Sequence, residues 1–227
     1  MTQEAIKLHD GYAAEWDDRY KSGGFRRRAK FVAEHIEPKL PNGGTWLDAG
    51  CGSGFFTRAI AKRGRTVLGV DGSSEMVSAA QLRAEGLPVA FETIDDLQTL
   101  DLGPRVFDGA ICLSVLEYLK HPQRAVRSIS SSLSIGAIAV FSVPNRKSVV
   151  RKVQGLSGRL PGRAPPKYLA YSTFSLDVEK APDWFAVNGF RVVETDHFDP
   201  ILPSYAHAAF APSLAYYILR KVHTLNV

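Results

Sequence analysis

Apolar runs and amphipathic helical segments alternate along most of the chain, a pattern typical of repeated βαβ units. Short apolar runs bounded by turn residues predict five strands, at residues 45–48, 66–70, 89–92, 107–113 and 137–143. Apolar residues at helical spacing predict helices between them, at residues 55–63, 74–85 and 122–133. Two further strands are expected near residues 190–195 and 215–222. The alternation therefore predicts an α/β fold with a mainly parallel sheet.

Three segments lie outside this alternation. Residues 2–20 and 25–40 predict two N-terminal helices, separated by a break at Ser22-Gly23-Gly24. Residues 144–172 are rich in Pro, Gly and Arg and have no clear period, which predicts a long insertion after the fifth strand. Residues 175–188 are helix-like, and Pro182 is expected to shorten or kink that helix. Because no repeat or linker divides the chain, we expect one domain over residues 1–227.

The composition of the chain fits a globular protein. It has 227 residues, of which 45% are apolar and 22% are charged, so it can bury a sizeable core. No apolar run approaches the roughly 18 residues of a membrane span, and the polar start predicts no signal peptide. Two cysteines, Cys51 and Cys112, exclude a disulfide framework, and no Cys/His spacing predicts a metal site. We therefore expect a cytoplasmic protein without a metal.

Charge is distributed unevenly along the chain. The formal net charge is +5, but residues 118–176 contain ten Lys or Arg and no Asp or Glu. The remaining residues carry a balance of −5, so the protein combines a basic segment with an acidic body. Such a segment suits an anionic small molecule, an anionic membrane surface or RNA, and a solvated loop is the alternative without a partner.

The candidate chemistry begins where the first strand enters a glycine-rich loop, with the pattern D-x-G-x-G-x-G from Asp48 to Gly54. Such a loop before a helix lets the backbone approach a ligand closely. Asp71 ends the second strand, where an acid can accept hydrogen bonds from both ribose hydroxyls. The dinucleotide fingerprint G-x-G-x-x-G would require glycine where Phe55 stands. A carboxylate at Asp48 favours the ammonium of S-adenosylmethionine over a diphosphate.

Several segments together resemble one family: LDAGCGSGF, VLGVDGSSEMVSAA, FETIDDLQ, FDGAICLSVLEYLKHP and LSIGAIAVFSVPN. They are similar to the successive motifs of class I S-adenosylmethionine-dependent methyltransferases, closest to the ubiquinone/menaquinone-methyltransferase-like group that acts on small molecules. The resemblance is strong over residues 45–145 and weak toward both ends. It implies a doubly wound, Rossmann-like sheet of seven strands in the order 3-2-1-4-5-7-6. It also implies an N-terminal helical lid over residues 1–40 and a substrate wall built by residues 144–172.

The resemblance also implies which residues bind the cofactor. Asp48 would lie near the methionine amino group, Asp71 would hold the ribose hydroxyls, and Asp95 would accept the adenine amino hydrogen. The other implied contacts are the loop residues Gly50, Cys51, Gly52 and Gly54, the adenine neighbours Gly72 and Met76, the backbone of Leu113 and Ser114 beside the sulfonium, and the lid aromatics Tyr12, Trp16 and Tyr20. An amphipathic helix would instead pack the three aromatics as ordinary core, and this alternative stays open.

Methyl transfer from a sulfonium is an in-line displacement, so the enzyme mainly has to align the reactants and exclude water. A general base is needed only if the acceptor keeps its proton until the transition state. His121 is the candidate base, because it follows the fourth strand at the carboxyl edge of the sheet; a helix-capping or solvated histidine is the alternative. Tyr118 stands where many members of the family have histidine. The candidate substrate contacts are Glu117, Arg146, Tyr168 and Tyr171.

The sequence thus predicts an S-adenosylmethionine-dependent methyltransferase that modifies an oxygen, or else a nitrogen, of a small molecule in a biosynthetic pathway. Its acceptor is expected to be anionic or membrane-associated, and the protein cytoplasmic with peripheral membrane contact. An RNA methyltransferase using residues 118–176, a nicotinamide oxidoreductase and a non-catalytic cofactor-binding module are the competing interpretations. RNA methyltransferases usually carry an appended domain or a catalytic tetrapeptide, and neither is found, so small-molecule methylation is favoured.

Overall fold

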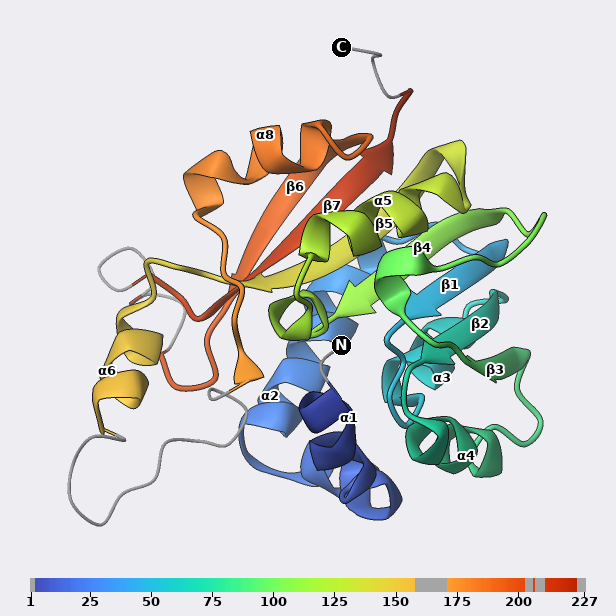
Figure 1. Ribbon diagram of the computed structural model, residues 1–227, viewed down its shortest axis with the longest axis horizontal. Helices are drawn as coiled ribbons and strands as arrows, with labels where there is room; N and C mark the ends of the chain where they lie inside the picture. The colour runs from blue at the N-terminus through green and yellow to red at the C-terminus, as the bar shows by residue number, and fades with distance from the viewer. Residues whose placement is uncertain (1–2, 158–170, 203–205, 207–210, 224–227) are drawn as a thin grey trace.

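The computed structural model describes residues 3–157, 171–202, 206 and 211–223. Its centre is an open sheet of seven strands in the order β3-β2-β1-β4-β5-β7-β6 (Figure 1). The strands are β1 (Thr45–Ala49), β2 (Thr66–Asp71), β3 (Val89–Thr93), β4 (Phe107–Leu113), β5 (Leu133–Pro144), β6 (Phe190–Phe198) and β7 (Leu214–Lys221). Neighbours among β1 to β5 pair in parallel, whereas β7 runs antiparallel to both β5 and β6. The predicted strand order is confirmed.

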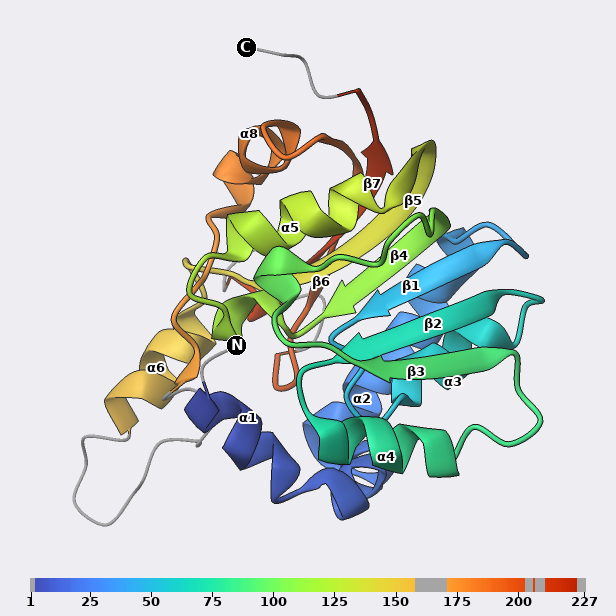
Figure 2. The ribbon, with the colours of Figure 1, turned by 45° about the vertical axis from the view of Figure 1, so that its right-hand side comes forward.

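Helices cover both faces of the sheet, as Figure 2 shows for α5 and α8 on one side and α2 and α3 on the other. The helices before β4 are α1 (Gln3–Asp10), η1 (Ala13–Lys21), α2 (Gly23–Phe31), η2 (Val32–Ile36), η3 (Glu37–Lys39), α3 (Phe55–Ala61), α4 (Ser74–Leu82) and η4 (Leu97–Thr99). Those after β4 are η5 (Leu116–Tyr118), α5 (Pro122–Ser131), α6 (Val149–Ser157), η6 (Val178–Lys180) and α8 (Ala181–Ala186).

The buried core has one layer on each face of the sheet. On one face, α5 and α8 contribute Val126 and Phe185, which pack with Phe141 of β5. On the other face, Trp46 of β1 packs with Ile36 and with Ile60 of α3. The central strands are therefore buried on both sides, which explains why β5 is almost continuously apolar.

Of the two predicted N-terminal helices, the first is wrong and the second agrees with the structure. A break at Gly11 divides the first into α1 and η1, whereas α2, η2 and η3 follow one another without a gap from Gly23 to Lys39, after the predicted break at Ser22. Glycine is a poor helix former, and the break at Gly11 lets η1 turn and place Trp16 against the cavity described below. The hypothesis of an insertion without regular structure is also wrong in part, because α6 occupies residues 149–157; residues 158–170 lie outside the described ranges.

The fold gathers loops from four parallel strands at one edge of the sheet. The carboxyl ends of β1, β2, β4 and β5 all meet there, because parallel strands end on the same side. In both ribbon views α1 lies near this edge (Figures 1 and 2). None of the helices in the described ranges combines the length and the apolar character that a membrane crossing needs.

Candidate functional site

One cavity of about 580 Å³ opens at the carboxyl edge of the sheet. Its walls come from α1, η1 and α2, from the loops after β1, β2 and β4, from α6, and from the start of β7. This volume falls in the range typical of small-molecule sites. The cavity therefore lies where the strand order reverses direction, at the position that open α/β sheets use for ligands.

The glycine loop forms one wall of the cavity. Gly50 has a φ of +81°, and a Cβ on it would lie 2.3 Å from Cγ2 of Val115. Gly52 has a φ of +52°, and its N–H donates to Oδ2 of Asp71 over 2.8 Å. Both glycines line the cavity, whereas Gly54 packs against Phe91 and does not line it. The loop thus requires glycine at its start and at its end, because Gly50 packs against Val115 and Gly54 against Phe91 too closely for a Cβ.

Two buried carboxylates lie behind this loop. Asp48 is 2% exposed, and its Oδ2 accepts a hydrogen bond from Oγ1 of Thr57 over 2.6 Å. Burial raises the pKa of Asp48 to about 7; the Thr57 hydrogen bond opposes the shift, and the charge of Asp71 adds to it. Burial also raises the pKa of Asp71, against the hydrogen bonds donated by the backbone of Ser73 and Gly52. Two acids held in this way favour a ligand that carries positive charge and hydroxyl donors.

Aromatic side chains of the N-terminal segment cover the loop. Tyr12, Trp16 and Tyr20 all line the cavity. The guanidinium carbon of Arg19 lies 4.3 Å from the ring centre of Tyr12 and 4.6 Å from that of Trp16. The ring centre of Tyr20 lies 3.8 Å from that of Phe55, and Tyr20 also packs against the core. Tyr20 therefore belongs both to the core and to the cavity wall.

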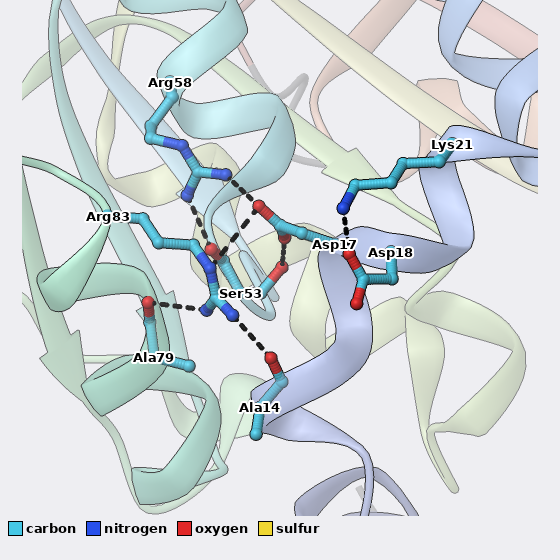
Figure 3. Close-up of polar contacts among 8 residues, drawn as sticks. All are labelled: Ala14, Asp17, Asp18, Lys21, Ser53, Arg58, Ala79 and Arg83. Atoms are coloured by element: carbon cyan, nitrogen blue, oxygen red, sulfur yellow. Dashed lines mark hydrogen bonds and ion pairs between the residues drawn. The ribbon is translucent and has the colours of Figure 1, made fainter.

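A polar cluster fastens the N-terminal segment to the loop and to α4; we call Asp17, Ser53, Arg58 and Arg83 the Asp17 cluster (Figure 3). The Asp17 carboxylate accepts hydrogen bonds from the Ser53 hydroxyl and from Nη2 of Arg58. Nε of Arg83 lies 3.7 Å from Oδ2 of Asp17, and its Nη2 donates to the carbonyl of Ala14. The neighbouring Asp18 pairs instead with Lys21, and both are exposed.

Arg28, Glu117 and Arg151 also line the cavity. Arg28 is bound to β5 and β7, on the opposite side of β4 from β1 and β2, so this is the end of the cavity away from the two carboxylates. Arg28 is 8% exposed; its Nε donates to Oη of Tyr216 over 2.6 Å. Glu117 is 4% exposed, and its Oε2 has no hydrogen-bond partner among the residues that the structure describes. Burial raises the pKa of Glu117, and the charges of Arg28 and Arg151 oppose that shift. This end of the cavity therefore combines two positively charged arginines with a glutamate that has one buried oxygen, Oε2, free to accept a hydrogen bond.

Ser114 stands between the two ends of the cavity. Its φ of +58° is the only positive φ of a non-glycine residue in the part of the chain that the structure describes. The Ser114 N–H donates to Oγ of Ser142 over 2.8 Å, and this bond fixes the turn after β4. Leu113 and Ser114 both line the cavity, as do Cys51 and Met76.

Other predicted site residues lie outside this cavity. Gly72 and Asp95 line a small adjoining pocket that shares Asp71 and Gly50 with it. His121 is exposed, and its backbone N–H donates to Oε1 of Gln98. His121, Arg146 and Tyr171 line neither pocket, and Tyr168 lies outside the described residues.

Some basic side chains of residues 118–176 have partners that the sequence did not predict. Lys147 pairs with Asp177 at 3.4 Å and Glu179 at 3.0 Å, both just beyond the segment. Arg127 donates to Asn188. Among the described basic residues of 118–176, only Arg151 reaches the cavity. The expectation of uncompensated charge is therefore wrong for Lys147, because the fold brings two acids that follow the segment to it. Arg159, Arg163 and Lys167 lie outside the described residues.

Sequence reasoning missed His9, Arg19, Arg28 and Arg151 as cavity residues. A signal existed for Arg28, which shares a helical face with Phe25 and Val32. A charged residue on an apolar helix face needs a buried partner, and its partners come from β5 and β7. For Arg151 no comparable signal existed, because it lies within a run of exposed basic residues.

The sheet order, the glycine loop and the two acids behind it define a class I S-adenosylmethionine-dependent methyltransferase. A family model described as a methyltransferase domain matches residues 20–203, and the chain belongs to this family. The cofactor of the family is S-adenosylmethionine. The residues present fit it, because Gly52 leaves space on the cavity wall, with no atom nearer than 4.0 Å to a Cβ built there, and the buried acids Asp48 and Asp71 are suited to an ammonium and a ribose.

Curated relatives and solved structures agree with this assignment. A ubiquinone biosynthesis O-methyltransferase of Coxiella burnetii is 32% identical over 121 residues, 52% of this chain and 50% of that protein, so the chain matches about half the length of this relative. The putative methyltransferase in a complex with the Trm112 activator of Haloferax volcanii has a TM-score of 0.73 at 19% identity, covering 95% and 98% of the two chains. The magnesium protoporphyrin IX methyltransferase of Synechocystis, solved with bound S-adenosylhomocysteine, has a TM-score of 0.66 at 19% identity, covering 95% and 99%. These two structures show the fold.

Proposed function

We propose that the protein transfers a methyl group from S-adenosylmethionine to a hydroxyl oxygen of a small-molecule acceptor that carries an acidic group. The observation that carries this proposal is that one cavity combines two different sets of residues. One end has a glycine wall and two buried carboxylates, and the other has Arg28, Arg151 and Glu117. The O-methyltransferase relatives support oxygen as the acceptor atom, ahead of nitrogen.

In this proposal the chain holds the methyl donor from three sides. S-adenosylmethionine supplies an electrophilic methyl group on a sulfonium. Asp48 holds its ammonium, Asp71 holds its ribose hydroxyls, and Gly72 and Asp95 lie toward the adenine. The Asp17 cluster keeps the N-terminal segment over the cavity, so residues 1–40 serve as a lid that excludes water.

At the other end the arginines orient the acceptor. Arg28 is held by Tyr216 and Ser142, so its charge is fixed in place before any acceptor binds. Fixed charges of this kind bind a carboxylate with little loss of side-chain entropy. Phe56 and Phe198 line the same cavity and suit an apolar or aromatic ring. Arg151 takes the part that the sequence prediction gave to Arg146.

A membrane-borne acceptor is the second candidate. On α6, Val149 and Val153 are 40% and 57% exposed beside Arg151 and Lys152, which supports peripheral contact with an anionic membrane. Sedimentation with vesicles tests it. Binding to vesicles of anionic lipid, weakened by Val153→Asp, is expected for a membrane-borne acceptor, and equal recovery in the supernatant with and without vesicles contradicts it.

The activity itself is tested with methyl-labelled S-adenosylmethionine. The protein is incubated with hydroxybenzoates, with short RNA and with a metabolite extract, beside the Asp71→Ala variant as a binding-deficient control. We expect label on the hydroxyl of an aromatic acid and little with the variant. Label in RNA, or no transfer to any small molecule by a protein that binds the donor, would contradict the proposal.

A further inference from the structure

Glu117 differs from the other acids of the cavity in having a fully buried oxygen without a partner among the described residues. In Asp48 a carboxylate oxygen accepts from Thr57, and in Asp71 both oxygens accept from backbone N–H groups. Glu117 lines the same cavity, and its buried Oε2 accepts nothing from the described residues. An unsatisfied buried carboxylate oxygen costs free energy, so a residue kept in this state points to a donor supplied by a ligand.

The backbone holds Glu117 firmly at this place. It lies in η5, directly after the strained turn at Ser114. Its carbonyl accepts a hydrogen bond from the N–H of Thr173 over 2.8 Å, which ties η5 to the chain after α6. The backbone that carries this side chain is therefore fixed before any acceptor enters, as is expected of a residue that meets a reacting atom.

The charges around Glu117 favour its ionised form. Arg28 from α2 and Arg151 from α6 act on it with positive charge, and the Ser114 side chain also stabilises the carboxylate. The other titratable groups that face it are Tyr216 on β7 and Cys112 on β4. His9 and Tyr118 line the same cavity, with their rings 5.6 Å apart. Burial raises the pKa of Glu117, which makes its carboxylate a stronger base. The positive charges of the two arginines favour the ionised form, which is the form that can accept a proton.

We propose that Oε2 of Glu117 takes the proton of the acceptor hydroxyl during methyl transfer, so that Glu117 and not His121 is the general base; this inference rests on the proposed function. The acceptor oxygen gains the methyl carbon, and the carbon–sulfur bond breaks with its electron pair remaining on sulfur. The O–H bond breaks at the same time, and its proton forms the new bond to Oε2. His121 is exposed and lines neither pocket, which leaves it out of reach in this arrangement.

The test uses Glu117→Gln in the full chain, with Glu179→Gln as a matched control. Glu179 has an 80% exposed side chain and pairs with Lys147 outside the cavity. The acceptor probe is 3,4-dihydroxybenzoate, which carries both hydroxyls and a carboxylate. Binding of S-adenosylhomocysteine and thermal unfolding are measured beside turnover. Should the Gln variant unfold, Glu117→Asp, which keeps the carboxylate and shortens its reach, replaces it.

We expect Glu117→Gln to lower turnover about 100-fold or more while S-adenosylhomocysteine affinity changes less than about 3-fold. The wild-type rate should fall as the pH drops and Glu117 becomes protonated, and this acidic limb should vanish in the variant. The deficit should narrow toward pH 10, where a phenol ionises without help. The Glu179→Gln control should match the wild type.

Three other outcomes overturn the inference, and they are distinguishable. Turnover by Glu117→Gln within about 3-fold of wild type, with the acidic limb intact, removes Glu117 as the base and leaves the proposed function standing. An equal loss of S-adenosylhomocysteine affinity assigns Glu117 to cofactor binding. If the wild type binds S-adenosylhomocysteine but does not methylate 3,4-dihydroxybenzoate, the proposed acceptor class fails together with this inference.

Discussion

The two ends of the cavity are built from the chain in different ways. At the end proposed for the cofactor, the loop and acids come from one stretch between Asp48 and Asp71. At the end proposed for the acceptor, Arg28, Glu117 and Arg151 come from three elements far apart in sequence, and Arg28 is held by β5 and β7. When one βαβ unit supplies all the residues of a site, their spacing in the sequence forms a recognisable motif. When the residues come from distant elements that pack together, the sequence contains no such motif.

The largest effect is expected on stability, at the cofactor end. Asp48 has a pKa of about 7 in the folded protein and about 4 in an unfolded chain, so the folded state binds its proton more tightly. This group therefore lowers the free energy of unfolding as the pH rises from about 4 to about 7, by up to about 4 kcal/mol. Asp48→Asn should remove that slope and stabilise the protein at pH 8, measured by urea unfolding across pH.

The control for this measurement is Asp183→Asn, at an exposed position on α8. It should leave the pH slope unchanged. If the free energy of unfolding depends on pH in the same way in the wild type and in Asp48→Asn, the pKa of Asp48 is not raised by burial.

Cofactor affinity is the next effect in size. Asp71→Ala removes the acceptor proposed for the ribose hydroxyls and also the anchor of the Gly52 N–H. We expect S-adenosylhomocysteine affinity to fall by about 1–3 kcal/mol, or about 5- to 150-fold, in calorimetric titration. Asp101→Ala, on an exposed loop, serves as the control. An unchanged affinity for Asp71→Ala would refute the ribose role.

The lid proposal predicts a smaller effect. Asp17→Ala breaks the Asp17 cluster, whose side chains are partly exposed, so we expect about a 5-fold loss of S-adenosylhomocysteine affinity. The matched control is Asp18→Ala, one residue away in the same helix, which pairs only with the exposed Lys21 in the contacts described here. Equal effects of the two substitutions would show that the lid closes by other contacts.

The smallest effect is expected for His121→Ala. Because His121 is exposed and lines neither pocket, turnover should stay within about 2-fold of wild type at every pH. The measurement is the pH profile of turnover with 3,4-dihydroxybenzoate. A lost acidic limb in this variant would return the general base to His121 and would count against Glu117.

The same contrast explains what the sequence alone could predict. The strand order and the glycine loop follow from motifs and alternation, since each depends on residues close together in the chain. Arg28 could only have been noticed as a charge on an apolar helix face, and its partners Tyr216 and Ser142 depend on how β5 and β7 pack. Lys147 was expected to be uncompensated because the acids that pair with it lie on the next element.

A crystal structure of the complex with S-adenosylhomocysteine would show directly whether the two ends of the cavity bind different ligands. We expect density between the glycine loop and the N-terminal segment, with an amino group near Asp48 and ribose hydroxyls on Asp71. The sulfur should face Ser114 and the end that carries Glu117 and Arg28. Density elsewhere, or a sulfur turned away from Glu117, would refute the proposed arrangement.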